Sequence, residues 1–273
     1  MSRRIVRTLR KTMLASATAA AFAATTASAQ AIEPILQGFN SPVGIHALGD
    51  ADLLVSNWGG GTVERVGANR ARTVFLDGIS SPAGIAVDAT GAVFVSSYSS
   101  GNIVRIAPDG SRKTIAEGLA TPTGIAFARD GRLLIANRSS GEIVTLNTAT
   151  GSRSVVARGL SLPVGVAEMP DGSIVSSQYG GRLTRILPGG KVHELGQSFN
   201  RPGVGILADG DNAVLVIDNG ASVVRRVSFD GQSSVVVDGL SGSAVALGRA
   251  ANGDLLIGTW GGGNIYRVAW PKS

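Results

Sequence analysis

The chain has 273 residues, with 25 Lys and Arg, 19 Asp and Glu, and a formal net charge of +6. It contains 38 glycines and 10 prolines but no cysteine. The absence of cysteine excludes disulfide bonds, thiolate metal sites and a cysteine nucleophile, so the folded part must be held together by packing.

The first 29 residues have the pattern of an export signal. Five basic residues, the last of them Lys11, precede a weakly apolar, alanine-rich run, and the small-residue sequence ASA ends at Ala29. This order is typical of a signal peptide that is cleaved after Ala29, and both Sec and twin-arginine export fit it. We therefore expect residues 1–29 to be a signal peptide, residues 30–273 to form one domain, and the protein to be periplasmic or secreted.

Charge and hydropathy after the leader limit the possible partners. Without the five basic residues of the leader, the chain keeps 20 basic and 19 acidic side chains. It therefore lacks the dense basic surface that neutralises nucleic-acid phosphates. No later segment approaches the roughly 20 apolar residues that a membrane helix needs. We expect neither a nucleic-acid partner nor a membrane span.

A proline recurs in the rest of the chain at an almost fixed spacing. Its successive spacings are 40, 40, 41 and 39 residues, from Pro42 through Pro82, Pro122 and Pro163 to Pro202. In a sixth copy, Ser243 is taken to stand at the proline position. Such a period indicates an array of one supersecondary unit. The expected copies span 38–77, 78–117, 118–158, 159–197, 198–238 and 239–270, and residues 31–37 complete the last one.

Each copy predicts four short strands. In the second copy, apolar runs such as AVFVSSY at 92–98 and NIVRIA at 102–107 are separated by the turn sequences ATG, SSG and PDG. Runs of Val, Ile and Phe between Gly, Asp and Pro are strand and hairpin signals. The second run of each copy is apolar on successive residues, which indicates a sheet covered on both faces. The sequence therefore predicts an all-β protein with four antiparallel strands per copy.

The two ends of the chain predict a closed ring. The sixth copy has only three strand patterns, whereas AIEPILQGF at 31–39 matches fourth-strand sequences such as ARTVFLDGI at 71–79. We expect this N-terminal segment to pair with the last copy as its outer strand, which removes the exposed sheet edges. The predicted fold is a six-bladed β-propeller.

The repeat also resembles a known group of proteins. The sequence PAGIAVDATGAVFVSSYSSGNIVRIAPDG, which begins at Pro82, resembles the NHL repeat. The whole chain after the leader is similar to the six-bladed superfamily that includes gluconolactonase and regucalcin-like proteins and virginiamycin B lyase. The resemblance implies the fold but selects no activity, because function depends on the sites that a fold carries.

The resemblance implies that loops gather at one mouth of a central channel. The residues implied at the ends of the second strands are Asn57, Ser97, Asn137, Ser177, Asp218 and Thr259. The residues implied one position further out are Trp58, Tyr98, Arg138, Gln178, Asn219 and Trp260. The residues implied after each proline are Val43, Ala83, Thr123, Val164, Gly203 or Val204, and Ala244.

Two kinds of enzymatic relative imply residues that this sequence lacks. Gluconolactonase-like proteins hold a divalent cation with carboxylate and amide oxygens, but Asp218 is the only acid among the implied positions, and a hard cation needs several oxygen ligands. Virginiamycin B lyase relies on a His and a Glu, where this chain has Ala244 and Thr259. His46 and His193 fall on different strands, and we expect both to be structural. We expect no catalytic residue, metal or cofactor.

The predicted binding site is the asymmetric outer ring of mouth residues. Blades six, one and two carry aromatic residues there, whereas blades three to five carry polar ones. Aromatic rings supply contact area and polar groups supply direction, although packing on the loops is an alternative role for these rings. We expect a monomeric module that binds a small molecule, a sugar, a peptide or another protein; the alternative is a propeller hydrolase or lyase. The expected site residues are Trp58, Tyr98, Arg138, Gln178, Asp218, Asn219 and Trp260.

Overall fold

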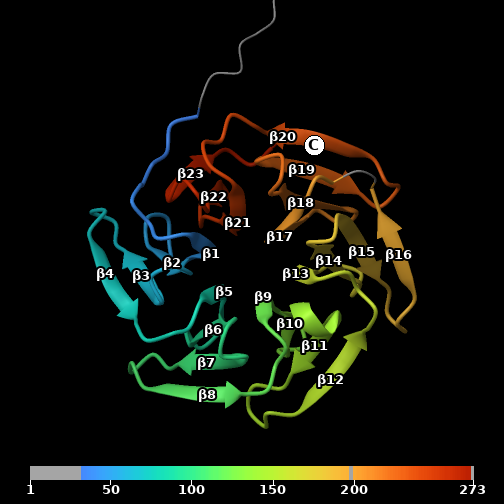
Figure 1. Ribbon diagram of the computed structural model, residues 1–273, viewed down its shortest axis with the longest axis horizontal. Coiled ribbons are helices and arrows are strands. Elements are labelled where there is room, and N and C mark those ends of the chain that lie inside the picture. Colours follow the sequence, from blue (N-terminus) through green and yellow to red (C-terminus); the bar gives the residue numbers. More distant parts are fainter. Residues whose placement is uncertain (1–31, 197–198, 272–273) are drawn as a thin grey trace, which may run out of the picture.

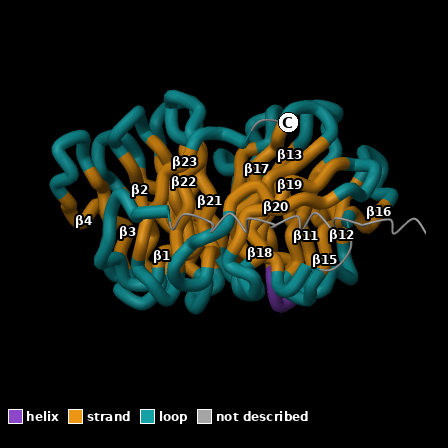
Figure 2. Tube along the Cα trace, turned by 90° about the horizontal axis from the view of Figure 1, so that it is seen from above, coloured by secondary structure: helices purple, strands orange, loops and turns teal. Residues whose placement is uncertain are grey.

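The computed structural model describes residues 32–196 and 199–271, so the expected signal peptide lies outside the described residues. The described chain forms six β-sheets that surround a central channel and follow one another in sequence order (Figure 1). From the side, the ring is a flattened disc (Figure 2). The structure is a six-bladed β-propeller, as the sequence predicts. Within these residues, no helix has the length and apolar character needed to cross a bilayer.

Each blade runs outward from the channel through its strands in chain order. The first strands are β1 (Pro42–Ala47), β5 (Pro82–Val87), β9 (Pro122–Phe127), β13 (Pro163–Glu168), β17 (Pro202–Asp209) and β21 (Ala244–Arg249). The second strands are β2 (Leu53–Asn57), β6 (Val93–Ser97), β10 (Leu133–Asn137), β14 (Ile174–Gln178), β18 (Ala213–Asp218) and β22 (Leu255–Thr259). The third strands are β3 (Thr62–Val66), β7 (Asn102–Ile106), β11 (Glu142–Leu146), β15 (Arg182–Ile186), β19 (Val223–Ser228) and β23 (Asn264–Val268). The fourth strands are β4 (Arg72–Leu76), β8 (Arg112–Ala116), β12 (Arg153–Ala157), β16 (Val192–Leu195) and β20 (Ser233–Val237), and a 3-10 turn, η1 (Arg138–Ser140), follows β10.

The burial of the strands explains their composition. Every position of the six second strands is buried, because neighbouring blades cover both faces of each sheet. The fourth strands are exposed over their first three positions and buried at the last one. Burial of one Val, Leu or Ile side chain stabilises a protein by about 1.5–3 kcal/mol. Stacking of the blades is therefore the main source of stability.

The first strands of adjacent blades approach so closely that a glycine is required between them. A Cβ atom on Gly84 would lie 2.6 Å from the carbonyl oxygen of Thr123 and 2.8 Å from the amide nitrogen of Ile125, both in the next blade. Ser96 bridges the same contact, because its Oγ accepts from the Gly84 amide at 2.8 Å and donates to the Thr123 carbonyl at 2.5 Å. Ser56 forms the equivalent bridge from blade one to blade two. The glycine that recurs two residues after the proline therefore allows the first strands of adjacent blades to approach closely.

Replacement of Gly84 by Ala is expected to lower the stability of the protein by about 1–3 kcal/mol, because the overpacked atoms belong to the backbone. The matched control is Gly261→Ala, where a new Cβ meets nothing within 4 Å and the backbone needs no positive φ. Thermal unfolding followed by circular dichroism measures both variants. Equal melting temperatures for Gly84→Ala and the control would contradict the close approach of the blades.

The N-terminal segment closes the ring through a short bridge. Leu36 pairs in an antiparallel manner with Ile265 of β23, the Ile35 amide donates to the Ile265 carbonyl at 2.8 Å, and the Ile265 amide donates to the Leu36 carbonyl at 2.9 Å. The Phe39 amide donates to the Gly263 carbonyl at 3.0 Å. Ile35 and Leu36 also pack on the core shared by blades one and six. The predicted closure is confirmed, with a bridge in place of a full outer strand.

Strand pairing corrects the alignment of two repeats. In blade four, Pro163 pairs with Gln178, so Gln178 and not Ser177 ends the second strand. In blade six, Ala244 faces the last residue of β22 and therefore stands at the proline position that the sequence comparison gave to Ser243. Both shifts amount to one residue, which local sequence similarity does not detect but the hydrogen-bonded register does.

Candidate functional site

A cavity of about 330 Å³ lies at one mouth of the channel. It is bordered by the loops that precede the first strands and by those that follow the second strands. Its inner wall consists of first-strand residues that are apolar except for Thr123. The inner residues are Val43, Thr123, Val164, Val204 and Val245, and the rim residues are Trp58, Tyr98, Arg138, Tyr179, Arg201, Asn219 and Trp260.

Three aromatic rings form one side of the rim. The centre of the Trp58 ring lies 4.4 Å from that of Tyr98 and 5.5 Å from that of Trp260, with tilted planes in both pairs. Trp58 is half-buried, whereas Trp260 is 38% exposed. The structure brings these three residues together from blades six, one and two. They present a partly accessible apolar surface beside the cavity.

Two arginines and a tyrosine form the opposite side of the rim. Arg138 begins η1, its Nη1 donates to the Tyr98 hydroxyl at 2.9 Å, and its guanidinium lies 5.2 Å from the Tyr179 ring centre. The Arg201 guanidinium lies 5.1 Å from the centre of the same Tyr179 ring, and its Nη1 donates to the Tyr179 hydroxyl at 3.3 Å. Neither arginine forms an ion pair within the described residues. Both therefore carry a positive charge that no carboxylate balances.

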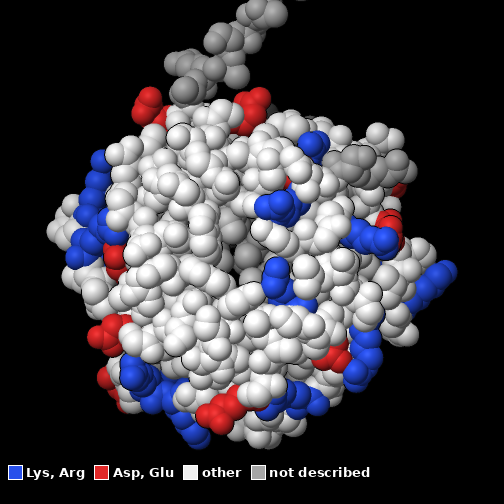
Figure 3. Space-filling model, viewed as in Figure 1, with Lys and Arg blue, Asp and Glu red and all other residues white. Residues whose placement is uncertain are grey.

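The mouth is electrostatically one-sided. No Asp or Glu of the described residues lines the cavity, and in Figure 3 the charged atoms nearest to the central hollow are basic. The rim also contains the Asn219 side chain, whose amide group donates to the Ala244 carbonyl at 2.7 Å. The arrangement can therefore stack a flat apolar face against Trp58 and its neighbours and place an anionic group at the arginines.

Gln178 lies beneath the mouth instead of in it. Its side chain is buried, its Oε1 accepts from the Ser161 amide at 2.5 Å, and its amide group donates to Thr184. The next residue, Tyr179, takes the rim position. The sequence prediction selected Gln178 because it started one residue early, at Ser177. In blades one to three the strand ends fifteen residues after the proline and the rim residue follows at sixteen, so a count of sixteen residues from Pro163 would have selected Tyr179.

Asp218 also has a structural role and does not line the cavity. It is completely buried, its Oδ1 accepts from the Arg201 amide at 2.9 Å, and its Oδ2 accepts from the Asn200 amide at 3.2 Å and from Arg225 Nε at 2.9 Å. The carboxylate thus holds the loop that carries Arg201. Sequence reasoning missed Arg201, although it is the only charged residue directly before a repeat proline.

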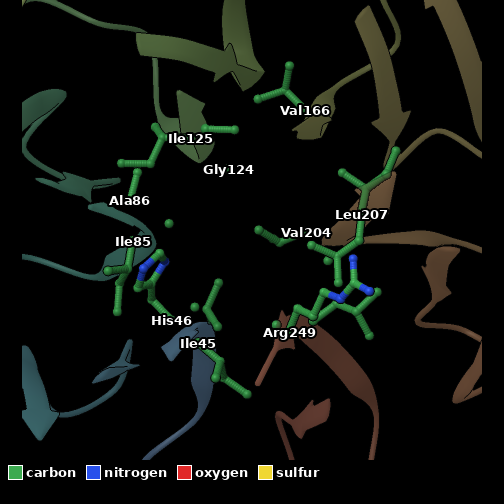
Figure 4. Close-up of a pocket in the computed structure, with 18 of the residues that line it drawn as sticks. Ile45, His46, Ile85, Ala86, Gly124, Ile125, Val166, Val204, Leu207 and Arg249 are labelled. Carbon is green, nitrogen blue, oxygen red and sulfur yellow. The ribbon is translucent and has the colours of Figure 1, made fainter. Parts of the chain in front are cut away.

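A second cavity, of about 290 Å³, lies further along the channel and is lined by first strands of all six blades (Figure 4). The two cavities share Val43 and Val204. Among residues 32–196 and 199–271, the ionisable residues that line it are His46 and Arg249, from the adjacent blades one and six. Burial lowers the pKa of His46 and so favours its neutral form. The lining of this chamber is therefore mainly apolar, with the charge of Arg249 at its wall.

The acidic and histidine side chains are dispersed. Within residues 32–196 and 199–271, no three His, Asp or Glu side chains form a group that could hold a metal ion. His193 lies at an exposed position of the outer strand β16 in blade four, whereas His46 lies in the first strand β1 of blade one. The two histidines therefore do not act together.

Comparison with known proteins shows similarity at the level of the fold. No family model matches the sequence, and no curated protein matches it. A gluconolactonase of Xanthomonas campestris superposes with a TM-score of 0.77 and 18% identity, over 87% of this chain and 89% of that one. Virginiamycin B lyase of Staphylococcus aureus gives 0.66 and 15%, over 86% of each chain. A chain of a nidogen–laminin complex gives 0.63 and 18%, over 70% of this chain and 78% of that one.

These comparisons define the class of protein. The chain is a six-bladed β-propeller with the architecture found in gluconolactonase and virginiamycin B lyase structures. A chain of the nidogen–laminin complex has a similar fold. Because the identities are low, the similarity concerns the fold, and the activity must be argued from the mouth residues.

Proposed function

We propose that the protein binds a small anionic molecule with a flat apolar or sugar-like face at the channel mouth. The observation that carries this proposal is the pairing of an aromatic wall around Trp58 with two unbalanced guanidinium groups, Arg138 and Arg201, across one cavity. The signal-peptide pattern of residues 1–29 supports a periplasmic or secreted location for this binding. A neutral scaffold surface would need no such asymmetry.

The aromatic wall would supply most of the contact area. Indole and phenol rings bind flat apolar faces and the C–H faces of sugars, and aromatic contacts contribute about 0.5–1.5 kcal/mol beyond area burial. Trp58 is held between two other rings, so its orientation is fixed before a ligand arrives. Such preorganisation reduces the entropy lost on binding.

The arginines would determine the charge of the ligand. A guanidinium group binds a carboxylate or phosphate through two parallel hydrogen bonds. Tyr179 lies against both Arg138 and Arg201, and this contact limits the orientations that each guanidinium adopts. The cavity volume, about 330 Å³, is at the lower end of the usual range for ligand sites, about 300–1,000 Å³. We therefore expect a small ligand with one or two negative groups.

A screen of the purified protein tests this proposal. Thermal-shift measurements with aromatic carboxylates, sugar acids and sugar phosphates are expected to reveal ligands, because a molecule that binds only the folded state raises the melting temperature. For a ligand found in this way, Trp58→Ala/Trp260→Ala should weaken binding by about 30-fold or more, as expected for an aromatic hot spot of about 2 kcal/mol. Titration calorimetry measures this change.

Matched variants separate binding from folding. Trp270→Ala removes the remaining tryptophan, which lies outside the mouth, where its Nε1 donates to Asp209 at 2.8 Å, and it should leave the affinity unchanged. Arg138→Gln/Arg201→Gln should remove the preference for the acid over its neutral amide or ester. Normal binding by the tryptophan pair variant, or its unfolding, would show that the rings only pack on the loops. Turnover of a lactone or cleavage of a screened compound would replace the binding role with catalysis.

A further inference from the structure

A third cavity, which is polar and has a volume of about 220 Å³, lies within blade two. Its wall includes Ser80 and Ser100 from the loops, Ser97 at the end of β6, Asn102 at the start of β7, and Arg112 at the start of β8. No Asp or Glu of the described residues contributes to it. The pocket is separate from the mouth cavity, with which it shares no lining residue. Comparison with the other blades shows why a space exists here.

In blade one, the equivalent space is occupied by a carboxylate. Glu64 of β3 accepts from Asn57 Nδ2 at 2.9 Å and from Arg72 Nε at 2.6 Å. Arg72 also donates to the Gln37 carbonyl at 2.9 Å. The side chain of Glu64 is 19% exposed and that of Arg72 is 30% exposed. The side chains of Asn57, Glu64 and Arg72 therefore fill this part of the blade and are linked to one another by hydrogen bonds.

In blade two, the same register positions carry Ser97, Val104 and Arg112. Val104 stands where blade one has the Glu64 carboxylate, and the Ser97 side chain is too short to fill the space. Arg112 keeps the bond to the preceding linker, where Nη1 donates to the Asp77 carbonyl at 3.1 Å. Its only ion pair is with the 80% exposed Asp77 carboxylate at 3.8 Å, and exposed pairs of this kind contribute little. The guanidinium therefore lacks the buried carboxylate partner that Arg72 has.

The other blades fill this space with at least one long side chain. In blade six, for example, Tyr266 is completely buried and its hydroxyl contacts the Ser241 backbone. Blade two alone combines a serine with a valine. The corresponding pairs in blades three to six are Asn137 with Val144, Gln178 with Thr184, Asp218 with Arg225, and Thr259 with Tyr266.

A second observation concerns Asn102, which forms part of the pocket wall. Its Oδ1 atom is buried and has no hydrogen-bond partner within the described residues. Buried polar atoms are almost always paired, and an unpaired one is costly. The pocket thus contains a cation without a buried counterion, and an unpaired, buried acceptor lies in its wall. A hydrogen phosphate ion offers acceptor oxygens to the cation.

We propose that the blade-two pocket is a binding site for a small oxyanion, which takes the place that the Glu64 carboxylate has in blade one. Arg112 binds the anion through charge-assisted hydrogen bonds, and the hydroxyl groups of Ser80 and Ser100 surround it. Lys113, which also lines the pocket, adds a second positive charge. Phosphate, free or as a terminal group of a larger ligand, fits best, and sulfate and carboxylates share the chemistry.

Titration of the full-length chain with inorganic phosphate tests the site. Sulfate and acetate are compared at constant ionic strength, and we expect phosphate to bind with a dissociation constant of the order of 1 mM. Arg112→Gln, at a half-exposed position, should weaken phosphate binding about tenfold or more, because it removes the charge-assisted bonds. Ser97→Asn/Val104→Glu, which installs the pair found in blade one, should have the same effect. Acetate binding equal to that of phosphate would extend the site to carboxylates.

Two controls assign the anion to this pocket. Arg153→Gln changes the equivalent arginine of blade three and should leave phosphate binding unchanged. Asn57→Ser/Glu64→Val imposes the blade-two pair on blade one and should raise the stoichiometry toward two phosphates per chain. Absence of phosphate, sulfate and acetate binding would overturn the proposal. Binding that survives Arg112→Gln but is lost in Arg138→Gln/Arg201→Gln would also overturn it, because the anion would then occupy the mouth.

Discussion

A chain that begins at Gly38 is expected to melt well below one that begins at Ile32. The shorter chain lacks Ile35 and Leu36, whose backbone groups pair with Ile265 and whose side chains pack on the core between blades one and six. Full burial of two such side chains stabilises a protein by about 3–6 kcal/mol, and because Ile35 and Leu36 are partly buried we expect a loss of about 2–4 kcal/mol. For a domain of this size, each kcal/mol corresponds to about 2–4 °C, so the melting temperature should fall by about 4–16 °C.

The same truncation should change the association state. Without residues 32–37, the outer edge of β23 has unpaired backbone groups next to the buried Ile265, and a free apolar edge promotes pairing between chains. Size-exclusion chromatography at several protein concentrations measures this effect, with the chain from Ile32 as the control. A truncated chain that melts like the control and elutes as the same species would show that the N-terminal bridge does not close the ring.

Asp218→Asn is expected to cost about 3 kcal/mol or more, the range observed when one member of a buried ion pair is removed. The carboxylate receives three donors, from the Asn200 and Arg201 amides and from Arg225. An asparagine has one acceptor oxygen, and its NH₂ group would face donors. Arg225, which is 24% exposed, would lose its counterion. Denaturant unfolding measures the loss.

Asp238→Asn is the matched control for this variant. Asp238 follows β20, is exposed and makes no hydrogen bond through its side chain in the described structure, so its replacement should change stability by less than about 0.5 kcal/mol. Equal unfolding midpoints for the two variants would show that Asp218 is not a structural anchor. Because Asp218 holds the loop that carries Arg201, Asp218→Asn should also lower the affinity for any anionic ligand that binds at the mouth.

Some of the mouth residues could be predicted from the sequence and others could not. Trp58, Tyr98 and Trp260 were expected together because blades six, one and two are neighbours once the ring closes. In the structure, the ring centres of Tyr98 and Trp260 lie 4.4 Å and 5.5 Å from that of Trp58. The burial of Asp218 could not be derived in the same way, whereas the constant spacing from the proline would have identified Gln178 as a strand-end residue. A residue at a strand end points either into the mouth or into the sheet, and only the pairing register decides between these.

The sequence by itself determined the number of blades, the four-strand unit and the ring closure, because each of these follows from a local pattern that repeats about every 40 residues. The tertiary structure decided which side chains meet across blades. Arg138 and Arg201 lie about 60 residues apart in the chain but face the same Tyr179 ring, and the space beside Arg112 exists because Ser97 and Val104 are both short. Such contacts depend on one-residue differences in register and on side-chain length at equivalent positions. A repeat pattern averages over these differences, whereas packing responds to each of them.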